Sequence, residues 1–201
     1  MPASRPFIVG LGGTTREGSS SEMAMRCTLM AAERLGAETA LLAGPDLIFP
    51  MYAPEQSYRH PRAERVVEML RKSDGVIISS PGYHGSISGL IKNALDYAED
   101  MRSDDAPYFD GRAVGCIVCA YGWQATGTTL MALRSIVHAL RGWPTPMGVG
   151  INTTGKIFDA AGACIDAGVA KQLELMALQV VQFAQMRAAY ALPPPQVAAA
   201  G

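Results

Sequence analysis

The 201-residue chain has no run of about 20 apolar residues, the length that a membrane-spanning helix needs. Its first apolar run, within MPASRPFIVGLGG, is too short for the hydrophobic region of a signal peptide and leads directly into a glycine-rich turn. We therefore expect a cytoplasmic protein with no membrane partner.

The chain also lacks an excess of either charge. Its 17 Lys and Arg and 18 Asp and Glu residues give a net charge of −1. Such a balance offers no electrostatic reason to bind nucleic acid or an anionic membrane. The three histidines show no metal-ligand spacing, so no metal site is expected.

Cysteine is scarce, and the four residues are too scattered for a disulfide framework. Cys116 and Cys119 have C-x-x-C spacing, but they lie in the apolar run GRAVGCIVCA, which reads as a buried strand. Residues three apart on a strand point to opposite faces, so we expect the two thiols to diverge. This favours packing over a redox or metal role.

Short apolar runs alternate with amphipathic stretches five times along the chain. This pattern predicts a parallel sheet covered by helices on both faces, with strand order 2-1-3-4-5 and ligands bound at the carboxyl ends of the strands. We expect one domain, residues 1–190, and a frayed tail, residues 191–201. The predicted strands are 6–12, 39–42, 75–80, 112–120 and 145–151, and the predicted helices are 19–35, 61–73, 88–101, 126–142 and 164–190.

The loop after the first strand reads GGTTREGSSS, residues 12–21, and enters a helix. Its glycines, hydroxyls and single guanidinium, next to the free N–H groups of a helix N-terminus, suit a phosphate monoester. Ser19 stands where a nucleotide-triphosphate P-loop requires Lys. Thr15 stands at the third glycine position of a dinucleotide fingerprint, and no acidic residue ends the second strand. An ordinary loop with an N-cap serine remains the alternative.

The loop after the third strand is more specific. Residues 79–97 read SSPGYHGSISGLIKNALDY. This segment resembles the P-x-Y-N-x-S-x-P-G-x-L-K-N-A-L-D-[WY] motif of the NADPH-dependent FMN reductase family, and residues 12–21 are similar to that family's phosphate loop. The chain departs from the motifs at His84, where Asn is usual, at Ser88, where Pro is usual, and at Thr14, where Ser is usual.

The resemblance, which spans about residues 7–165, implies an α/β flavodoxin-like three-layer sandwich that binds FMN. It implies that the phosphate is held by Thr14, Arg16, Ser19 and Ser21, with Ser20 close by. It also implies that the ring is bordered by Pro81, Gly82, Tyr83 and His84, with Gly85 and Ser86 in the same loop. Tyr83 has a second reading, as an aromatic side chain half-buried under the following helix.

The loop after the fourth strand holds five further candidates: Tyr121, Gly122, Trp123, Gln124 and Gly127. Trp123 and Gln124 are expected to line the flavin or the nicotinamide site, or Trp123 packs at a subunit interface. No catalytic residue is assigned. His84 is a candidate general acid, although hydride transfer is chemistry of the cofactors that the protein mainly positions.

These features predict an NAD(P)H-dependent FMN reductase, with NADPH or NADH as donor. The acceptor is free flavin, which a partner monooxygenase would receive, or alternatively a quinone, an azo dye or a metal oxyanion. Two other classes stay open: a flavodoxin-type electron carrier, which the near-neutral charge disfavours, and a flavin-free scaffold. The resemblance further implies a homodimer or homotetramer. Arg59, Arg62 and Arg102 are the candidates for contacting the 2′-phosphate of NADPH.

Overall fold

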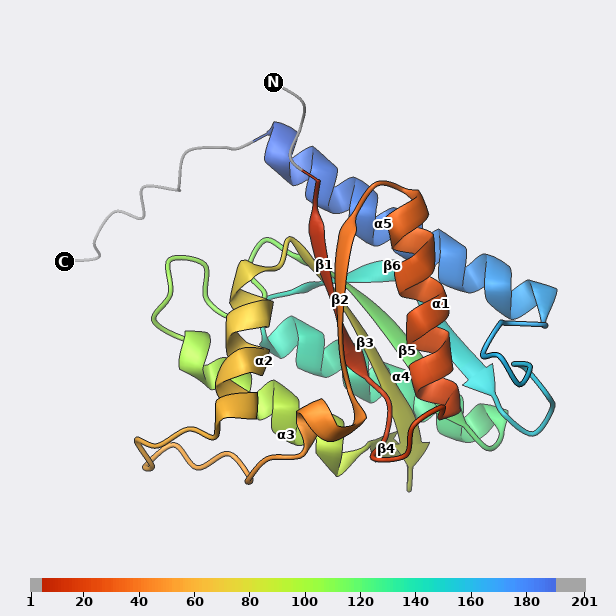
Figure 1. The fold of residues 1–201 in the computed structure, drawn as a ribbon, viewed down its shortest axis with the longest axis horizontal. Coiled ribbons are helices and arrows are strands. Elements are labelled where there is room, and N and C mark those ends of the chain that lie inside the picture. Colours follow the sequence, from red (N-terminus) through yellow and green to blue (C-terminus); the bar gives the residue numbers. More distant parts are fainter. Residues whose placement is uncertain (1–4, 191–201) are drawn as a thin grey trace.

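Five parallel strands form the centre of the structure, a computed structural model that describes residues 5–190 (Figure 1). Their order is β2-β1-β3-β5-β6, and a two-residue strand, β4, pairs with the end of β3. The strands are β1 (Phe7–Gly12), β2 (Glu38–Ala43), β3 (Gly75–Tyr83), β4 (Ser86–Ile87), β5 (Ala113–Ala120) and β6 (Trp143–Asn152). The helices are α1 (Ser20–Arg34), α2 (Pro61–Lys72), α3 (Gly89–Asp96), α4 (Trp123–Ala139) and α5 (Ala167–Ala189), with 3₁₀ turns at Gly44–Leu47 and Tyr97–Met101.

The predicted sheet order is confirmed, because β1, β2, β3, β5 and β6 are the first to fifth predicted strands. The antiparallel strand β4 is an addition that the sequence analysis did not predict. The tail predicted for residues 191–201 lies outside the described residues. None of the described helices is both long and apolar enough to cross a membrane.

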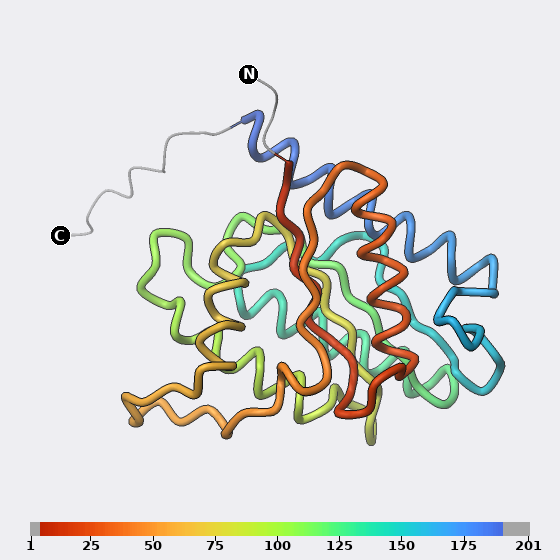
Figure 2. Tube along the Cα trace, in the orientation of Figure 1, coloured from red at the N-terminus to blue at the C-terminus, as the bar shows by residue number. Residues whose placement is uncertain are grey.

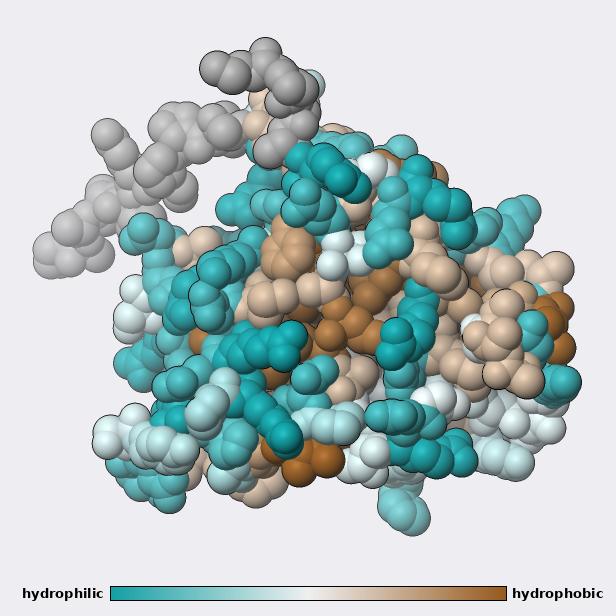
Figure 3. Space-filling model, in the orientation of Figure 1, coloured by the Kyte–Doolittle hydropathy of each residue, from teal (hydrophilic) through white to brown (hydrophobic). Residues whose placement is uncertain are grey.

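Helices cover both faces of the sheet and enclose two cores. α1 and α5 pack on one face, and α2, α3 and α4 pack on the other (Figure 1). The face seen in Figure 3 is mostly hydrophilic, with apolar groups gathered near its middle, where the edge strand β2 runs. Cys116 belongs to one core and Cys119 to the other, as expected for residues three apart on a strand. Burial raises the pKa of each thiol to about 12, which fits a packing role.

Several helix ends follow the sequence rules closely. Ser19 is the N-cap of α1 and accepts a hydrogen bond from the N–H of Glu22, and Pro61 opens α2. Within α1, Met30 is largely exposed. The buried face of this helix includes Met25 and Leu29, which pack against the sheet.

The limits predicted for the fourth helix are wrong at both ends. α4 begins at Trp123 and not at Thr126, because Gly122 acts as its N-cap with φ of 99°. At the other end, α4 stops at Ala139 and not at residue 142, and Arg141 takes the left-handed conformation that follows many helices. Gly142 is required for close packing, since a Cβ atom there would lie 2.9 Å from side chains of Val114 and Val137.

Candidate active site

The loop between β1 and α1 lies at the carboxyl edge of the sheet, directly beside the end of β3 (Figure 2). The N–H of Gly13 donates to the carbonyl of Ser79 (3.2 Å), and the hydroxyl of Ser79 donates to the carbonyl of Ser21 (2.8 Å). Gly12 permits this contact, because a Cβ atom at this position would lie 2.7 Å from the Ser79 carbonyl oxygen. The first and second predicted site loops are therefore adjacent.

Internal hydrogen bonds fix the shape of the first loop. The Thr14 hydroxyl bonds with the backbone of Arg16, and the Ser19 hydroxyl lies 3.4 Å from both the Ser21 hydroxyl and the N–H of Glu22. Ser19 and Ser21 are almost fully buried, and Ser20 is half-buried. Three of the hydroxyl groups implied as phosphate ligands thus already support the loop itself.

The groups that remain free in this loop suit an anion. The N–H groups of Thr15, Glu17, Ser20 and Ser21 have no acceptor among residues 5–190, and the latter two open α1. Arg16 is exposed and forms no ion pair with a described residue. Free backbone donors at the positive end of a 15-residue helix, in a loop that also carries the exposed Arg16, fit a phosphate monoester.

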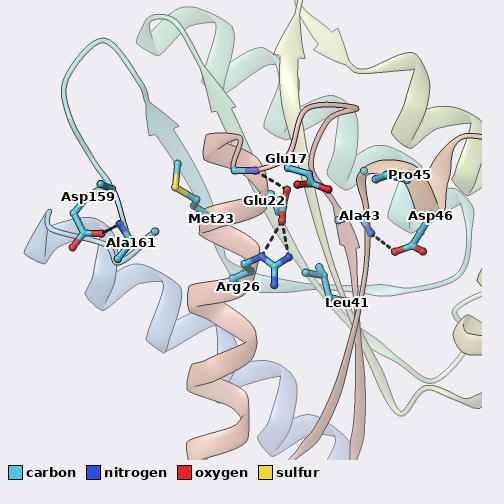
Figure 4. A pocket seen from close by; sticks show the side chains of 14 residues that line it. Glu17, Glu22, Met23, Arg26, Leu41, Ala43, Pro45, Asp46, Asp159 and Ala161 are labelled. Carbon is cyan, nitrogen blue, oxygen red and sulfur yellow. Dashed lines mark hydrogen bonds and ion pairs between the residues drawn. The ribbon is translucent and has the colours of Figure 1, made fainter.

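A pocket of about 930 Å³ borders the same loop but has the wrong charge for a phosphate. Four carboxylates line it, from Glu17, Glu22, Asp46 and Asp159, against the single guanidinium of Arg26 (Figure 4). The Glu22 carboxylate accepts from the N–H of Gly18 (3.1 Å) and pairs with Arg26 (2.7 Å). This pocket therefore does not compete with the free N–H groups as the candidate phosphate site.

The second loop is a tight hairpin. Tyr83 pairs with Ser86 across a two-residue turn formed by His84 and Gly85, with φ of 51° and 85°. Two successive positive φ angles define a turn that favours Asn followed by Gly, and histidine is one of the other residues that tolerate the left-handed region. The conformation thus explains why His84 can stand at a position where the motif has Asn.

The groups at this hairpin are open to solvent. Tyr83 is 53% exposed, so about half of its surface is open to solvent. His84 is also exposed, and a Cβ atom on Gly85 would meet nothing within 4 Å. Pro81 is buried, because β3 still pairs with β5 at this position, and Gly82 is partly buried where β3 pairs with β4. Ser88 serves as the N-cap of α3 and accepts from the N–H of Ile91 (3.2 Å).

The third loop is shorter than expected, because Trp123, Gln124 and Gly127 belong to α4. Only Tyr121 and Gly122 separate β5 from the helix. The side chains of Tyr121 and Trp123 are 81% and 71% exposed. They line a pocket of about 520 Å³ together with Gly85 of the second loop, so the structure brings two of the predicted loops together here.

Two asparagines that the sequence analysis did not single out as site residues hold the loops in place. Asn152, the last residue of β6, accepts from the N–H groups of Gly122 and Thr154, both at 3.1 Å. Asn93, in the K-N-A-L-D-Y segment, accepts from the N–H of Tyr52 and donates to the carbonyl of Pro50. An asparagine at the carboxyl end of a predicted strand was the available signal for Asn152.

The arginines suggested for a 2′-phosphate are engaged elsewhere. Arg59 forms a bidentate pair with Asp100 (2.7 and 2.9 Å), and this hydrogen-bonded carboxylate raises its pKa. Arg62 donates to the carbonyl of Ile48, and Arg102 pairs with Glu99 at 3.6 Å. Arg59 makes the shortest contacts of the three, and it links the segment before α2 to the 3₁₀ turn that contains Asp100.

The sheet order and the placement of the loops at its carboxyl edge define a flavodoxin-like α/β fold. Solved structures of this fold resemble the chain, among them RosB with a bound riboflavin-phosphate derivative (TM-score 0.75, 14% identity, 93% of this chain and 82% of that chain). Another is the NAD(P)H:(acceptor) oxidoreductase of Paracoccus denitrificans (TM-score 0.68, 20% identity, 90% of this chain and 98% of that chain).

Sequence comparison identifies the family. Residues 6–155 match the model of the NADPH-dependent FMN reductase family, and the chain belongs to this family. An NAD(P)H-dependent FMN reductase of Pseudomonas aeruginosa is 28% identical over 180 residues, which cover 87% of this chain and 92% of that protein. An FMN-dependent NADPH-azoreductase of Staphylococcus saprophyticus is 33% identical over 99 residues, about half of each chain. The predicted family, with FMN and NAD(P)H as its cofactors, is confirmed.

Proposed function

We propose that the protein is an NAD(P)H-dependent flavin reductase that holds FMN along the carboxyl edge of β1, β3 and β5. The observation that carries this proposal is the set of free N–H groups at the start of α1 beside the unpaired Arg16. These donors would bind the FMN phosphate. Thr14, Ser19 and Ser21 would mainly hold the loop in its binding shape, since their hydroxyls already bond within the loop.

The second and third loops would border the flavin ring. Backbone next to Gly85 and Gly122 faces open space, which permits close approach of a flat ring. When bound, FMN supplies the hydride-accepting and electron-transferring chemistry, and the residues of the chain bind and orient it. The exposed Tyr83 would contact the ring, and His84 would shape the turn through its backbone.

The donor is NADPH or NADH, and the acceptor is a small molecule such as free flavin, a quinone, an azo compound or a metal oxyanion. Free reduced flavin would serve a partner monooxygenase. We further propose a cytoplasmic homo-oligomer, in which subunit contacts would cover some of the large apolar side chains that are exposed on the single chain, among them Met51, Tyr58 and Met131.

Steady-state NAD(P)H oxidation by the purified protein, with and without excess FMN, tests the proposal. We expect turnover with bound FMN alone, and a further increase with added FMN if free flavin is the acceptor. Absence of NAD(P)H oxidation in an FMN-binding protein would indicate an electron carrier. Absence of FMN binding would indicate a flavin-free scaffold.

A further inference from the structure

Glu22 is a buried carboxylate that bonds to the candidate phosphate loop between β1 and α1. The residue is 5% exposed and lies three positions after Ser19, the N-cap of α1. An acid at this position usually accepts a hydrogen bond from the N–H of the N-cap residue itself. Here its Oε2 accepts instead from the N–H of Gly18 (3.1 Å), which adopts a positive φ of 65°. The side chain therefore fixes the loop just before the helix begins.

The bond to Gly18 places a negative charge close to the free N–H groups of the loop. Since consecutive residues are about 3.8 Å apart, Oε2 of Glu22 lies about 7 Å or less from the backbone nitrogen of Glu17. Charges at such distances are only partly screened, because the Debye length is about 8 Å at physiological ionic strength. A phosphate bound at these N–H groups would therefore be repelled by Glu22.

Arg26 offsets this charge only in part. Its Nε and Nη2 both donate to Oε1 of Glu22, at 2.9 and 2.7 Å, while Oε2 is turned toward Gly18 (Figure 4). The Arg26 side chain is 59% exposed, so water shields much of its charge. Three further carboxylates line the same pocket, and Arg26 is the only guanidinium among its lining residues. The pocket side of the loop therefore keeps an excess of negative charge.

We propose that Glu22 is a positioning residue of the phosphate site, which holds the loop through Gly18 and at the same time lowers its affinity for the phosphate. This inference rests on the proposed function, because it concerns the site assigned there to FMN. The hydrogen bond and the charge of Glu22 act on FMN binding in opposite directions. The phosphate would therefore leave faster than it would from the same loop with a neutral acceptor at residue 22.

Glu22→Gln separates the charge from the hydrogen bond, since the amide oxygen can still accept from the N–H of Gly18. At low ionic strength the Kd for FMN should fall about two- to fivefold, the effect of removing one like charge near a helix N-terminus. The Kd for riboflavin, which lacks the phosphate, should not change. In 1 M KCl, where the Debye length is about 3 Å, both proteins should bind FMN equally. A purely structural role would not show this dependence on salt.

Two further variants complete the comparison. Asp46→Asn is the matched control, because it neutralises a carboxylate of the same pocket that bonds to Ala43 and not to the loop. It should leave the Kd for FMN within twofold. Glu22→Ala removes both the charge and the acceptor, so it should bind FMN about three- to tenfold more weakly than Glu22→Gln. If Glu22→Ala does not fold, Glu22→Gln alone decides.

Three results would overturn the proposal. One is an unchanged or higher Kd for FMN in Glu22→Gln at low ionic strength. Another is an equal change in the Kd values for FMN and riboflavin. The third is a fall in the Kd for FMN that Asp46→Asn reproduces in full, because the charge of Glu22 would then have no special place.

Inorganic phosphate provides a readout without flavin. The melting temperature of each protein is measured in potassium phosphate and in potassium chloride of equal ionic strength. Phosphate should stabilise Glu22→Gln more than the unmodified protein, since a ligand stabilises in proportion to its affinity. An equal or smaller stabilisation would contradict the role of the charge.

These outcomes separate the two proposals. NAD(P)H oxidation by a protein whose FMN affinity is the same with Glu22 or Gln at this position refutes the role of Glu22 and leaves the reductase function intact. Stronger stabilisation of Glu22→Gln by phosphate, in a protein that neither binds flavin nor oxidises NAD(P)H, supports the role of Glu22 and refutes the reductase.

Discussion

Residues 13–21 and residues 121–124 each follow a parallel strand and enter a helix, but the two loops use their polar groups differently. In the first loop, side-chain hydroxyls bond within the loop, and backbone N–H groups with one arginine are left free. In the second, a residue from a neighbouring strand, Asn152, ties the backbone, and large aromatic side chains are left free. The first arrangement suits a small anion, and the second suits a flat, uncharged ring.

The difference follows from the way in which the two helices are capped at their N-termini. α1 has a serine N-cap whose side chain accepts from the N–H of Glu22 in the first turn, and Ser79 of β3 adds two bonds to the same loop. The N-cap of α4 is Gly122, which has no side chain to cap the helix, and Asn152 instead holds the turn by accepting from the N–H of Gly122. If the comparison is correct, substitutions at one end should affect phosphate binding and those at the other should affect ring binding.

Arg16→Ala should have the largest effect on flavin binding, and it should weaken only the contact with the FMN phosphate. Loss of one charge-assisted hydrogen bond, worth about 1.5–3 kcal/mol, should raise the Kd for FMN roughly 10- to 100-fold. Riboflavin, which lacks the phosphate, should bind the variant and the unmodified protein equally. Flavin fluorescence titration measures both constants. An equal loss for both ligands would contradict the assignment of Arg16 to the phosphate.

Asn152→Leu should destabilise the protein and weaken binding of the flavin ring at residues 121–124. Two N–H groups lose their acceptor, which should lower the free energy of unfolding by about 1–3 kcal/mol. Asn152→Asp keeps an acceptor oxygen and should recover most of that loss. Urea unfolding measures stability, and the Kd for riboflavin reports on the turn. If Asn152→Leu changed stability but left this Kd unaltered, the asparagine would have only a structural role.

The alternation of strands and helices was sufficient to predict the sheet order and the edge that carries the site, because both follow from parallel topology. It was not sufficient for contacts between distant segments. Asn152 reaches Gly122 across 30 positions, and Asn93 holds Pro50 across 43, and no local pattern encodes such pairs. The start of α4 was missed because Gly122 and Gly127 read as loop residues, whereas the first caps the helix and the second lies within it.

Two substitutions of Ser19 test whether this residue supports the loop or lies close to the bound phosphate. Ser19→Ala should remove the N-cap of α1 and lower the free energy of unfolding by about 1 kcal/mol. Ser19→Asp should retain the cap, but its negative charge should weaken FMN more than riboflavin. Thermal unfolding and flavin titration of both variants provide the readouts. A Ser19→Asp variant that binds FMN as tightly as the unmodified protein would place the phosphate elsewhere.

The smallest effect is expected at His84. A role in the turn conformation and a role as general acid predict different results for this residue. If the residue matters for its left-handed backbone, His84→Asn should preserve activity and stability, because Asn is favoured at that position. His84→Ala should lower the free energy of unfolding by about 1 kcal/mol, since alanine adopts this conformation with more strain.

The pH profile of NAD(P)H oxidation supplies the control. A general acid at His84 would make the profiles of the unmodified enzyme and His84→Asn differ, because asparagine cannot donate a proton as an acid. We expect the two profiles to coincide, because the side chain is exposed and makes no hydrogen bond with a described residue. Coincident profiles together with a stability loss confined to His84→Ala would assign this residue to the turn, and the ring end would then depend on backbone and aromatic groups alone.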